Sequence, residues 1–417
     1  MSTALGDADL LRIENRLAAT DKLLESAYPG DSGARQPVHT VYVPADRFAP
    51  ALAAEWGAQA LAAVESAGGM ARLAELIGIS PSLIDSIADR VAAKLRAEPI
   101  EDLRLDFEDG YGDRGPIEDA DAVQAAALVS AAVTAGTAPP FIGIRFKCFE
   151  KPTRARALRT LDLFVGGLID AGGLPEGLVL TLPKVTTVAQ VEAMVDVAET
   201  LEKAHGLAPG RIRFEVQVET PQLVLGPDGR SPLAQLPLAA PGRISGLHYG
   251  TYDYSASLGI AAQCQSMEHP VADLAKEIMQ LAVAGTGIRV SDGSTNILPL
   301  GERAEEAWQL HARLVRRSLE RGFYQGWDLH PHQLPTRYLA TYAFYREGYP
   351  DAASRLRVYL EQATGAVLDE PATARALAWF VLRGAQCGAI DGDEILTDIG
   401  IDIDGLTALA HPRLVHV

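Results

Sequence analysis

From residue 101 onward the sequence alternates between short strand-like segments and longer helix-like segments, and this alternation restricts the fold more than any other feature. The strand candidates, with a first one near the N-terminus, are 39–43, 103–107, 141–146, 178–182, 212–218, 243–248, 286–290 and 325–329. The helix candidates between them include 118–135, 154–171, 187–205, 268–284 and 302–321. This pattern makes about eight β/α units, so we predict an α/β fold of the (β/α)8 TIM-barrel type. A doubly wound open sheet is the alternative, but no GxGxxG motif follows any of the strands.

Helix-like segments also flank the predicted barrel. Residues 7–27 have apolar positions on one broad face, and residues 48–98 are Ala-rich with a helical period, broken at Gly68-Gly69. Beyond residue 334 the expected helices are 334–347, 351–364 and 371–386. We therefore expect an N-terminal helical segment (1–38), a barrel (39–333) with a helical insertion after the first strand (48–98), and a C-terminal helical extension (334–417).

Composition excludes several classes of partner. The formal net charge of −17 argues against nucleic acid or an anionic membrane as the main partner. The sequence shows neither an apolar run that could span a bilayer nor a signal-peptide pattern. The three cysteines are too few and too dispersed for a disulfide framework, and none has a zinc-binding spacing. A cytoplasmic protein with free thiols is the expectation.

Acidic side chains gather where the strand near residue 105 ends. In EDLRLDFEDGYG (101–112) apolar and charged residues alternate, and Glu108 and Asp109 then lead into a glycine-containing turn. Loops at the carboxyl ends of parallel strands carry the active sites of α/β proteins. Acidic residues also end strands simply because turns are solvated, so this stretch alone leaves both interpretations open.

Two further strands carry a charged face. In 212–220 the polar side is formed by Arg213, Glu215, Gln217 and Glu219, and in 141–147 Arg145 and Lys147 share one face with Gly143. Charges inside a barrel are unfavourable unless they are paired or bind something. They could neutralise one another as an internal ion network, or they could hold an anionic substrate and a cation.

Asp253 follows another strand, in LHYGTYD (247–253). Together with Glu219 it forms a sparse, all-oxygen pair of carboxylates from separate strands. Mg²⁺ suits this pattern, with Mn²⁺ as a substitute, because Mg²⁺ keeps several waters and is completed by substrate oxygens. His248 is expected to be a hydrogen-bonding wall residue, and Asp328 and His330, at the last strand, to close the barrel.

The ordered set of strand ends resembles one known family. FED (107–109), Arg145, LPKV (182–185), ET (219–220), YGTYD (249–253) and HPHQL (330–334), with VYVPADRF (41–48) before them, are similar to the citrate lyase beta-subunit-like / HpcH–HpaI aldolase family. That family belongs to the phosphoenolpyruvate-binding barrel superfamily, which also includes malate synthases. The resemblance covers roughly residues 39–47 and 101–385.

The resemblance implies roles for individual residues. Glu219 and Asp253 would bind Mg²⁺, and Arg145 would bind a substrate oxygen and stabilise an enolate. Glu108 and Asp109 would either support the metal-bound water from behind its ligands or act as acid/base groups. The substrate-binding residues implied besides Arg145 are Lys184, Gly250 and Thr251. Asp369, in GAVLDEPATARA (365–376), would be a catalytic base supplied to a neighbouring subunit, or alternatively a helix N-cap.

The expected activity is that of a Mg²⁺-dependent carbon–carbon lyase or aldolase. It would act through a metal-stabilised enolate of a 2-oxo acid or an acyl thioester, within a homo-oligomer. One alternative is an acyl-CoA condensing or hydrolysing enzyme, like malate synthase or malyl-CoA thioesterase. The other is a barrel that has lost catalytic activity and serves as a ligand-binding or assembly module.

Overall fold

The computed structural model describes residues 4–361 and 370–411. Eight parallel strands pair in the order β7-β6-β5-β4-β3-β2-β1-β8. Two backbone hydrogen bonds, from Asp292 to Gln325 (2.9 Å) and from Trp327 to Gly293 (3.1 Å), bring the two edges of this sheet together. The predicted TIM barrel is confirmed. Its strands are β1 (His39–Pro44), β2 (Asp102–Asp106), β3 (Phe141–Arg145), β4 (Leu178–Leu182), β5 (Phe214–Val218), β6 (Ile244–Tyr249), β7 (Arg289–Ser291) and β8 (Gly326–Asp328).

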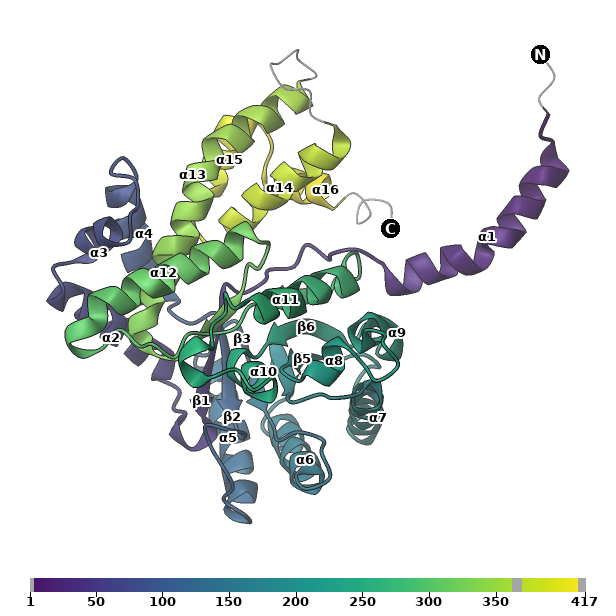
Figure 1. Ribbon diagram of the computed structural model, residues 1–417, viewed down its shortest axis with the longest axis horizontal. Coiled ribbons are helices and arrows are strands. Elements are labelled where there is room, and N and C mark those ends of the chain that lie inside the picture. The colour runs from purple at the N-terminus through teal and green to yellow at the C-terminus, as the bar shows by residue number, and fades with distance from the viewer. Residues whose placement is uncertain (1–3, 362–369, 412–417) are drawn as a thin grey trace.

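Helices surround the barrel, as Figure 1 shows. Those that follow β2 to β7 are α5 (Ile117–Thr134), α6 (Arg154–Asp170), α7 (Val188–Ala204), α8 (Pro221–Val224), α9 (Leu236–Ala239), α10 (Thr251–Ser257), α11 (Pro270–Val283) and α12 (Ala304–Glu320). Short 3₁₀ helices are η1 (Ala45–Arg47), η2 (Pro232–Gln235), η3 (Ala262–Cys264), η4 (Gly301–Arg303) and η5 (Pro331–Gln333). Apolar strand residues such as Leu103, Leu105 and Ile144 are buried in a core shared with these helices.

The three additional helical parts are also present. After β1 the chain forms α2 (Leu52–Ser66), α3 (Met70–Leu76) and α4 (Ile84–Ala97), with the expected break at Gly68-Gly69. The C-terminal helices α13 (Leu334–Leu360), α14 (Pro371–Gln386), α15 (Gly392–Ile399) and α16 (Ile403–Ala410) form a layer beyond the barrel (Figure 1). An ion pair of 2.6 Å between Arg90 of α4 and Asp391 joins the two groups.

The prediction of separate helices at 334–347 and 351–364 is wrong, because α13 runs without interruption through Pro350 to Leu360. A proline inside a helix removes one backbone hydrogen bond. Here tertiary contacts outweigh that loss: Tyr349 is buried and donates a hydrogen bond to Asp398 (3.0 Å), and Ala352 and Ala353 are buried in the core.

The strand predicted at 286–290 lies further along the chain, at Arg289–Ser291. Gly285 and Gly287 both adopt positive φ angles, of 78° and 79°, which a strand does not accommodate. A turn therefore occupies the first half of the predicted strand, and the Thr286 hydroxyl stabilises it by donating to the Val283 carbonyl (2.7 Å).

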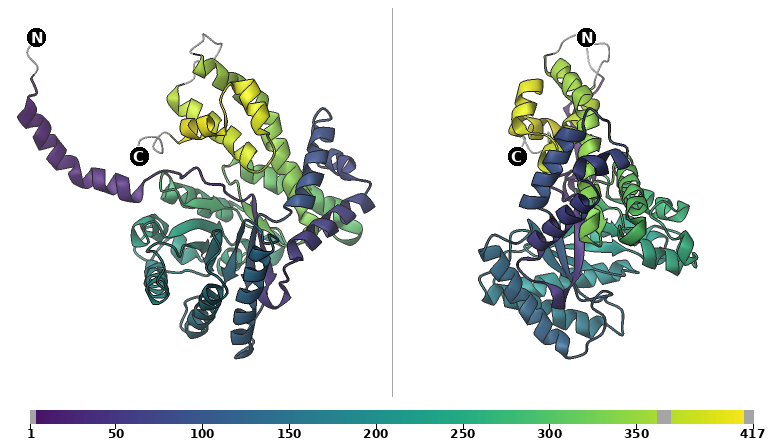
Figure 2. Two further views of the ribbon diagram at one scale, coloured as in Figure 1. Left: turned by 180° about the vertical axis from the view of Figure 1, so that it is seen from behind. Right: turned by 90° about the vertical axis from the view of Figure 1, so that its left-hand side faces the viewer.

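Helix α1 (Asp7–Ala27) projects from the body, as Figure 1 and the left-hand view of Figure 2 show. Ala27 is its only buried residue among those described. No helix in the described ranges is both long enough and apolar enough to cross a membrane.

Candidate active site

The predicted site residues lie at the carboxyl ends of neighbouring strands. Arg145 is the last residue of β3, Lys184 follows β4, and Glu219 follows β5. Glu108 and Asp109 follow β2, and Asp253 lies in the first turn of α10, just after β6. Because these strands are parallel neighbours, their ends meet at one mouth of the barrel.

Arg145 is held in one orientation by an ion pair. Its Nε and Nη2 atoms each donate to the Asp106 carboxylate at 2.7 Å, a bidentate geometry that fixes the plane of the guanidinium. Its Nη1 atom lies 3.3 Å from Glu108 Oε2. The Tyr42 ring, centred 4.7 Å from the guanidinium carbon, covers it.

Lys184 connects the acidic residues of the mouth. Its ammonium group donates to Glu108 (2.5 Å) and Asp109 (2.8 Å) and lies 3.8 Å from Asp253. Its backbone N–H donates to Glu219 at 2.7 Å. Burial acts to lower the pKa of Lys184, but the carboxylates of Glu108 and Asp109 raise it above its ordinary value, so the side chain carries its charge.

The backbone at Lys184 adopts a left-handed conformation with φ of 49°, and no other non-glycine residue in the described ranges has a positive φ. Such a conformation is unfavourable for a side chain other than glycine, and it is found mainly where the surrounding structure enforces it, often at functional sites. Here it lets one residue direct its N–H at Glu219 and its ammonium group at Glu108.

Glu219 is a buried carboxylate among other carboxylates. Burial, together with the charges of Glu108 and Asp253, raises its pKa to about 8. Burial also raises the pKa of Asp253, with a further contribution from Asp109. Gly250 packs directly on Glu219, since a Cβ atom there would lie 2.5 Å from Glu219 Oε2. A cation beside Glu219 and Asp253 would therefore relieve an unfavourable concentration of negative charge.

The donor set suits Mg²⁺. Glu219 and Asp253 offer only oxygen atoms, and an ion with few protein ligands keeps several waters. No group of three or more His, Cys, Asp or Glu side chains with the spacing of a metal site occurs in residues 4–361 and 370–411. The residues present therefore fit a sparsely coordinated Mg²⁺ better than zinc or calcium, which take more protein ligands.

The two remaining predicted site residues are Thr251, which begins α10 just after β6, and Asp369. Thr251 is buried, and its hydroxyl accepts the backbone N–H of Ser294 at 3.2 Å, so it supports the loop after β7. Asp369 lies outside the described residues, and its catalytic role stays a prediction.

Asp106 and Tyr42 belong to the site but were missed by the sequence reasoning. Asp106 lies in the acidic stretch at 101–112, and its inward position on β2 was readable from the alternation with Leu105 and Phe107. Its pairing with Arg145 requires knowledge that these residues are in register on β2 and β3. Tyr42 gives no polar pattern in the sequence that would distinguish it from a core residue.

His248 and Asp328 occupy the structural positions that were expected. His248 Nε2 lies 3.0 Å from Glu215, and its Nδ1 accepts a hydrogen bond from Trp327 (3.2 Å). Asp328 is fully buried and pairs with Arg337 (2.9 Å), His311 (3.0 Å) and His39 (2.7 Å). His39 is on β1, so this network ties the last strand to the first.

Fold and site together define a (β/α)8-barrel protein with an ionised arginine, a lysine and five carboxyl side chains at the carboxyl ends of its strands. The chain belongs to the family described as a domain of unknown function, DUF6986, whose model matches residues 17–414. Comparison with curated proteins gives no significant match.

Solved structures of similar architecture include two enzymes by name. The citrate lyase beta subunit of Mycobacterium tuberculosis, complexed with oxaloacetate and magnesium, is 19% identical with a TM-score of 0.42, over 74% of this chain and 98% of that one. Malate synthase of Haloferax volcanii, as a magnesium/glyoxylate complex, is 15% identical with a TM-score of 0.49, over 90% and 97%.

Proposed function

We propose that this protein is a Mg²⁺-dependent carbon–carbon lyase or aldolase that acts on a 2-oxo acid or an acyl thioester. The observation that carries the proposal is the buried Glu219 carboxylate, which lies with Asp253 next to the charged Arg145 and Lys184. A site that combines a cation-seeking pair of carboxylates with an oriented guanidinium suits a substrate that develops negative charge on an oxygen.

In this proposal Glu219 and Asp253 hold the metal, which supplies Lewis-acid polarisation of a substrate oxygen when bound. Arg145 is oriented by Asp106, and both of its terminal nitrogens keep a further N–H for a substrate carboxylate or carbonyl oxygen. Because Asp106 fixes the guanidinium before substrate arrives, little reorganisation opposes its stabilisation of developing negative charge.

Glu108 is the proposed acid/base group of the chain. It is buried, it lies against both Arg145 and Lys184, and Asp109 follows it directly. A carboxyl group that contacts the two substrate-binding cations is close to any substrate they hold. Lys184 can in turn neutralise whichever of Glu108 and Asp109 is ionised during a proton transfer.

The test is calorimetric titration of metal-stripped protein with Mg²⁺ and Mn²⁺, with and without pyruvate, oxaloacetate or acetyl-CoA. We expect metal binding that one of these ligands strengthens, and we expect Glu219→Gln to abolish it. Glu192→Gln, on the exposed face of α7, is the matched control and should bind as the wild type does.

The choice of ligand separates the two substrate classes. Enhancement by pyruvate or oxaloacetate assigns a 2-oxo-acid lyase, whereas enhancement by acetyl-CoA assigns the acyl-thioester reaction. Absence of metal binding under every condition would remove the lyase assignment and favour a barrel that binds without catalysing.

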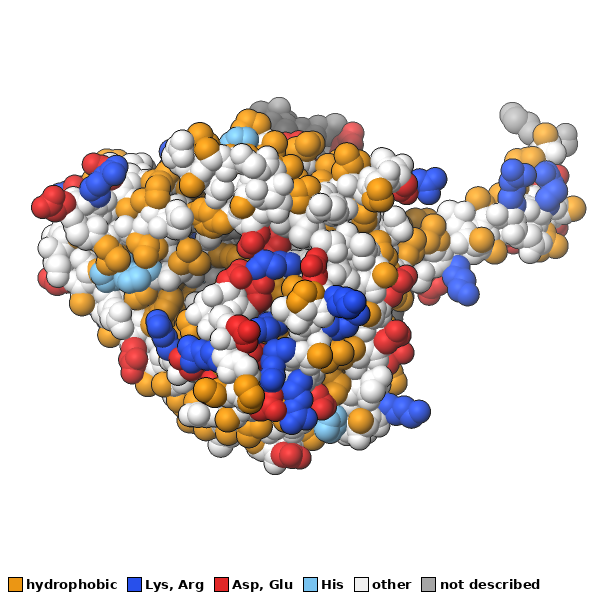
Figure 3. Space-filling model, turned by 60° about the horizontal axis from the view of Figure 1, so that its bottom comes forward, with side chains coloured by type: hydrophobic (Ala, Val, Ile, Leu, Met, Phe, Trp, Pro, Cys, Tyr) orange, Lys and Arg blue, Asp and Glu red, His pale blue; other side chains and the backbone are white. Residues whose placement is uncertain are grey.

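We also propose that the protein is a homo-oligomer in the cytoplasm. Helix α1 projects into solvent, and its leucines Leu10, Leu11, Leu17 and Leu24 are between 45% and 59% exposed. Figure 3 shows hydrophobic side chains along this arm. An isolated amphipathic helix is marginally stable unless its apolar face is covered. A second copy of the chain would cover it, and the free Cys148, Cys264 and Cys387 suit a reducing compartment.

Light scattering on the full chain, and on a chain that begins at residue 28, tests the association. We expect an oligomer that dissociates when α1 is removed. A monomeric full chain at micromolar concentration would contradict it, and cell fractionation tests the location.

A further inference from the structure

A cavity lies at the opposite end of the barrel from the candidate active site with Glu219 and Asp253, which is called the carboxylate site below. The cavity has a volume of about 230 Å³ and is lined by residues at the starts of strands, among them Asp102 of β2, Phe141 of β3, Leu178 of β4 and Arg289 of β7. The segment that leads from α1 to β1 forms another wall, with Ser32, Ala34, Arg35 and Pro37. Active-site groups follow the strands, so this cavity is separate from the candidate active site.

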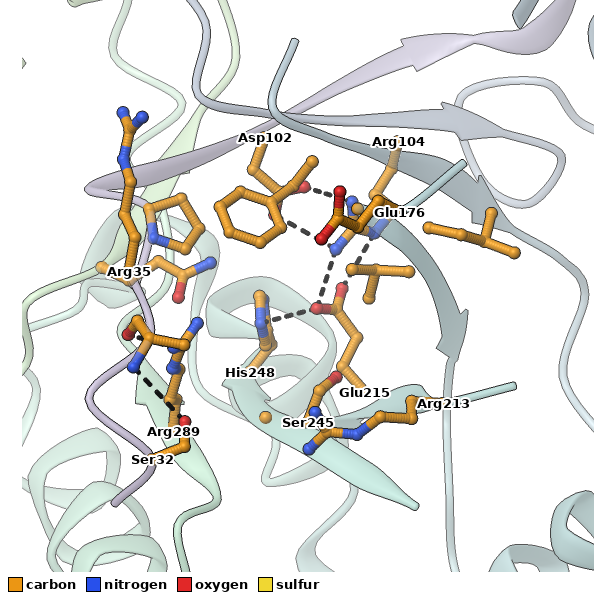
Figure 4. A pocket seen from close by; sticks show the side chains of 18 of the residues that line it. Ser32, Arg35, Asp102, Arg104, Glu176, Arg213, Glu215, Ser245, His248 and Arg289 are labelled. Carbon is orange, nitrogen blue, oxygen red and sulfur yellow. Dashed lines mark hydrogen bonds and ion pairs between the residues drawn. The ribbon is translucent and has the colours of Figure 1, made fainter. Parts of the chain in front are cut away.

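One side of this cavity is electrically balanced. Arg104 forms ion pairs with Asp102 and with Glu215 (2.9 Å), and Glu215 also contacts His248 at 3.0 Å. Burial acts to raise the pKa of Glu215, but Arg104 and His248 lower it strongly, so this carboxylate is ionised. Figure 4 shows the hydrogen bonds and ion pairs of this network, with Glu215 drawn close to Arg213. Here the internal ion network that the sequence left open is present.

Other arginines on the lining of the cavity have no carboxylate partner. Arg211 donates to the Leu174 carbonyl (3.0 Å), Arg213 to the Ile244 carbonyl (3.5 Å), and Arg289 to the Ala34 carbonyl. None of these arginines forms an ion pair with a carboxylate of residues 4–361 and 370–411. Arg35, also on the lining, is already neutralised by Glu98 and Glu101.

The guanidinium groups of Arg213 and Arg289 face an unfavourable environment as they stand. Burial lowers the pKa of Arg213. Burial also lowers the pKa of Arg289 to about 10, and the charges of Arg383 and Arg213 add to this shift, while Asp31 and Asp102 oppose it. Like-charged groups that influence one another in a partly enclosed space are stabilised by an anion between them. Glu176 also lines the cavity, but it is exposed, so solvent screens its charge.

We propose that this cavity binds a small molecule through a multiply charged oxyanion, a phosphate or a pair of carboxylates, held by Arg213 and Arg289. Ser245 lies between the two arginines in Figure 4, and its hydroxyl donates to the Phe214 carbonyl (3.2 Å), so the two guanidinium groups are the donors that would hold the anion. The cavity volume suits a single small anion rather than a nucleotide. The proposal does not depend on the lyase assignment, because no residue of the carboxylate site takes part.

Binding of inorganic phosphate and of malonate, followed by calorimetry and by the thermal unfolding midpoint at constant ionic strength, tests the proposal. We expect saturable binding and a raised midpoint with at least one of the two anions. Arg213→Gln and Arg289→Gln should each weaken binding at least tenfold. Arg213 is the substitution that disturbs the fold less, because the hydrogen bond that it donates to the Ile244 carbonyl is long (3.5 Å). Tighter binding of phosphate assigns a phosphate ester as the ligand class, and tighter binding of malonate assigns a dicarboxylate.

Two further variants show at which end of the barrel the anion binds. Arg230→Gln removes an exposed arginine outside the cavity and should leave the affinity unchanged. Lys184→Met removes a cation of the candidate active site and so reports any binding of the anion at that end of the barrel. If Lys184→Met abolishes anion binding while Arg213→Gln and Arg289→Gln retain it, the anion binds at the other end of the barrel and the proposal is wrong. Absence of saturable binding by the wild type overturns it as well.

Discussion

Asp106 holds Arg145 through two parallel hydrogen bonds of 2.7 Å, and the same carboxylate also fixes the turn that carries Glu108. Its oxygens accept the backbone N–H groups of Glu108 (3.0 Å) and Gly110 (2.9 Å). A Cβ atom at Gly110 would lie 2.8 Å from Asp106 Oδ2, so the turn passes close to the carboxylate. One side chain therefore sets the orientation of the guanidinium and the position of the neighbouring carboxyl group.

Substituting Asp106→Asn should weaken the site and the fold together. The amide keeps the shape but loses its charge and replaces one acceptor by a donor that faces Arg145. We expect the free energy of unfolding to fall by about 2 kcal/mol, as for a lost charge-assisted hydrogen bond. Ligand binding should weaken more than tenfold, because Arg145 is no longer oriented. Urea denaturation and calorimetry with oxaloacetate measure the two effects.

Asp46→Asn is the control for this substitution. Asp46 pairs with Arg114 at 2.8 Å, but both side chains are partly exposed, so the loss should be below about 1 kcal/mol. Wild-type ligand affinity in Asp106→Asn would show that Arg145 does not need Asp106 for its orientation.

The positions of the strand ends could be predicted from the sequence more accurately than the pairing of the side chains that lie there. Alternation of apolar and charged residues was enough to place Glu108, Arg145 and Glu219 at one mouth, because parallel strands end together. The pairing of Arg145 with Asp106 depends on the register of β2 and β3, which no local pattern encodes. Likewise, the left-handed backbone at Lys184 is imposed by its tertiary surroundings, and local propensity would place glycine there.

The helix boundaries, too, depend partly on local sequence and partly on tertiary packing. The prediction ended one helix at residue 347 and began the next at 351, whereas α13 continues through Pro350, although proline breaks helices when nothing compensates. The buried Tyr349, Ala352 and Ala353 supply that compensation, and their burial becomes visible only once α13 is packed. Conversely, the break at Gly68-Gly69 was predictable, because a pair of glycines with positive φ needs no tertiary partner to end a helix.

Lys184→Met should tighten the binding of Mg²⁺. The ammonium group of Lys184 lies among Glu108, Asp109 and Asp253, so it neutralises charge that would otherwise attract a metal ion. Methionine removes the charge, while the backbone N–H that donates to Glu219 is retained. We expect the Kd for Mg²⁺ to fall about tenfold, equivalent to about 1.4 kcal/mol, and oxaloacetate to bind less tightly. Calorimetric titration measures both.

The exposed Lys203, at the end of α7, provides the control Lys203→Met, which should change neither affinity. Weaker Mg²⁺ binding in Lys184→Met would show instead that Lys184 supports the metal site.

Gly143→Ala should prevent β3 and β4 from pairing as they do. A Cβ atom at Gly143 would lie 1.7 Å from the Val179 carbonyl oxygen and 2.7 Å from its carbon, and both are backbone atoms of β4. Strand backbone cannot move aside without breaking its ladder, so we expect a loss of about 3 kcal/mol or more in the free energy of unfolding. Thermal unfolding measures the loss, with Gly6→Ala as the control because no atom lies within 4 Å of its added Cβ. Equal unfolding midpoints for the two variants would contradict the clash.

Asp328→Asn should destabilise the barrel in a pH-dependent way. Burial acts to raise the pKa of Asp328, but Arg337, His311 and His39 hold it well below its usual range. A carboxyl group with a lowered pKa stabilises the fold above its unfolded pKa of about 4, and this contribution is lost as the pH falls toward the folded pKa. Removing the charge leaves Arg337 buried without its partner, which costs about 3–5 kcal/mol at pH 7.

The comparison that isolates this effect is urea denaturation of wild type and Asp328→Asn at pH 7, pH 5 and pH 3. The difference in unfolding free energy should be largest and nearly equal at pH 7 and pH 5, since the carboxyl group is ionised in both the folded and the unfolded chain at these values. It should shrink at pH 3, because the unfolded chain then takes up a proton that the folded chain does not. A difference that stays constant down to pH 3 would mean that the variant acts through lost packing, and that the charge of Asp328 is not what joins β8 to β1.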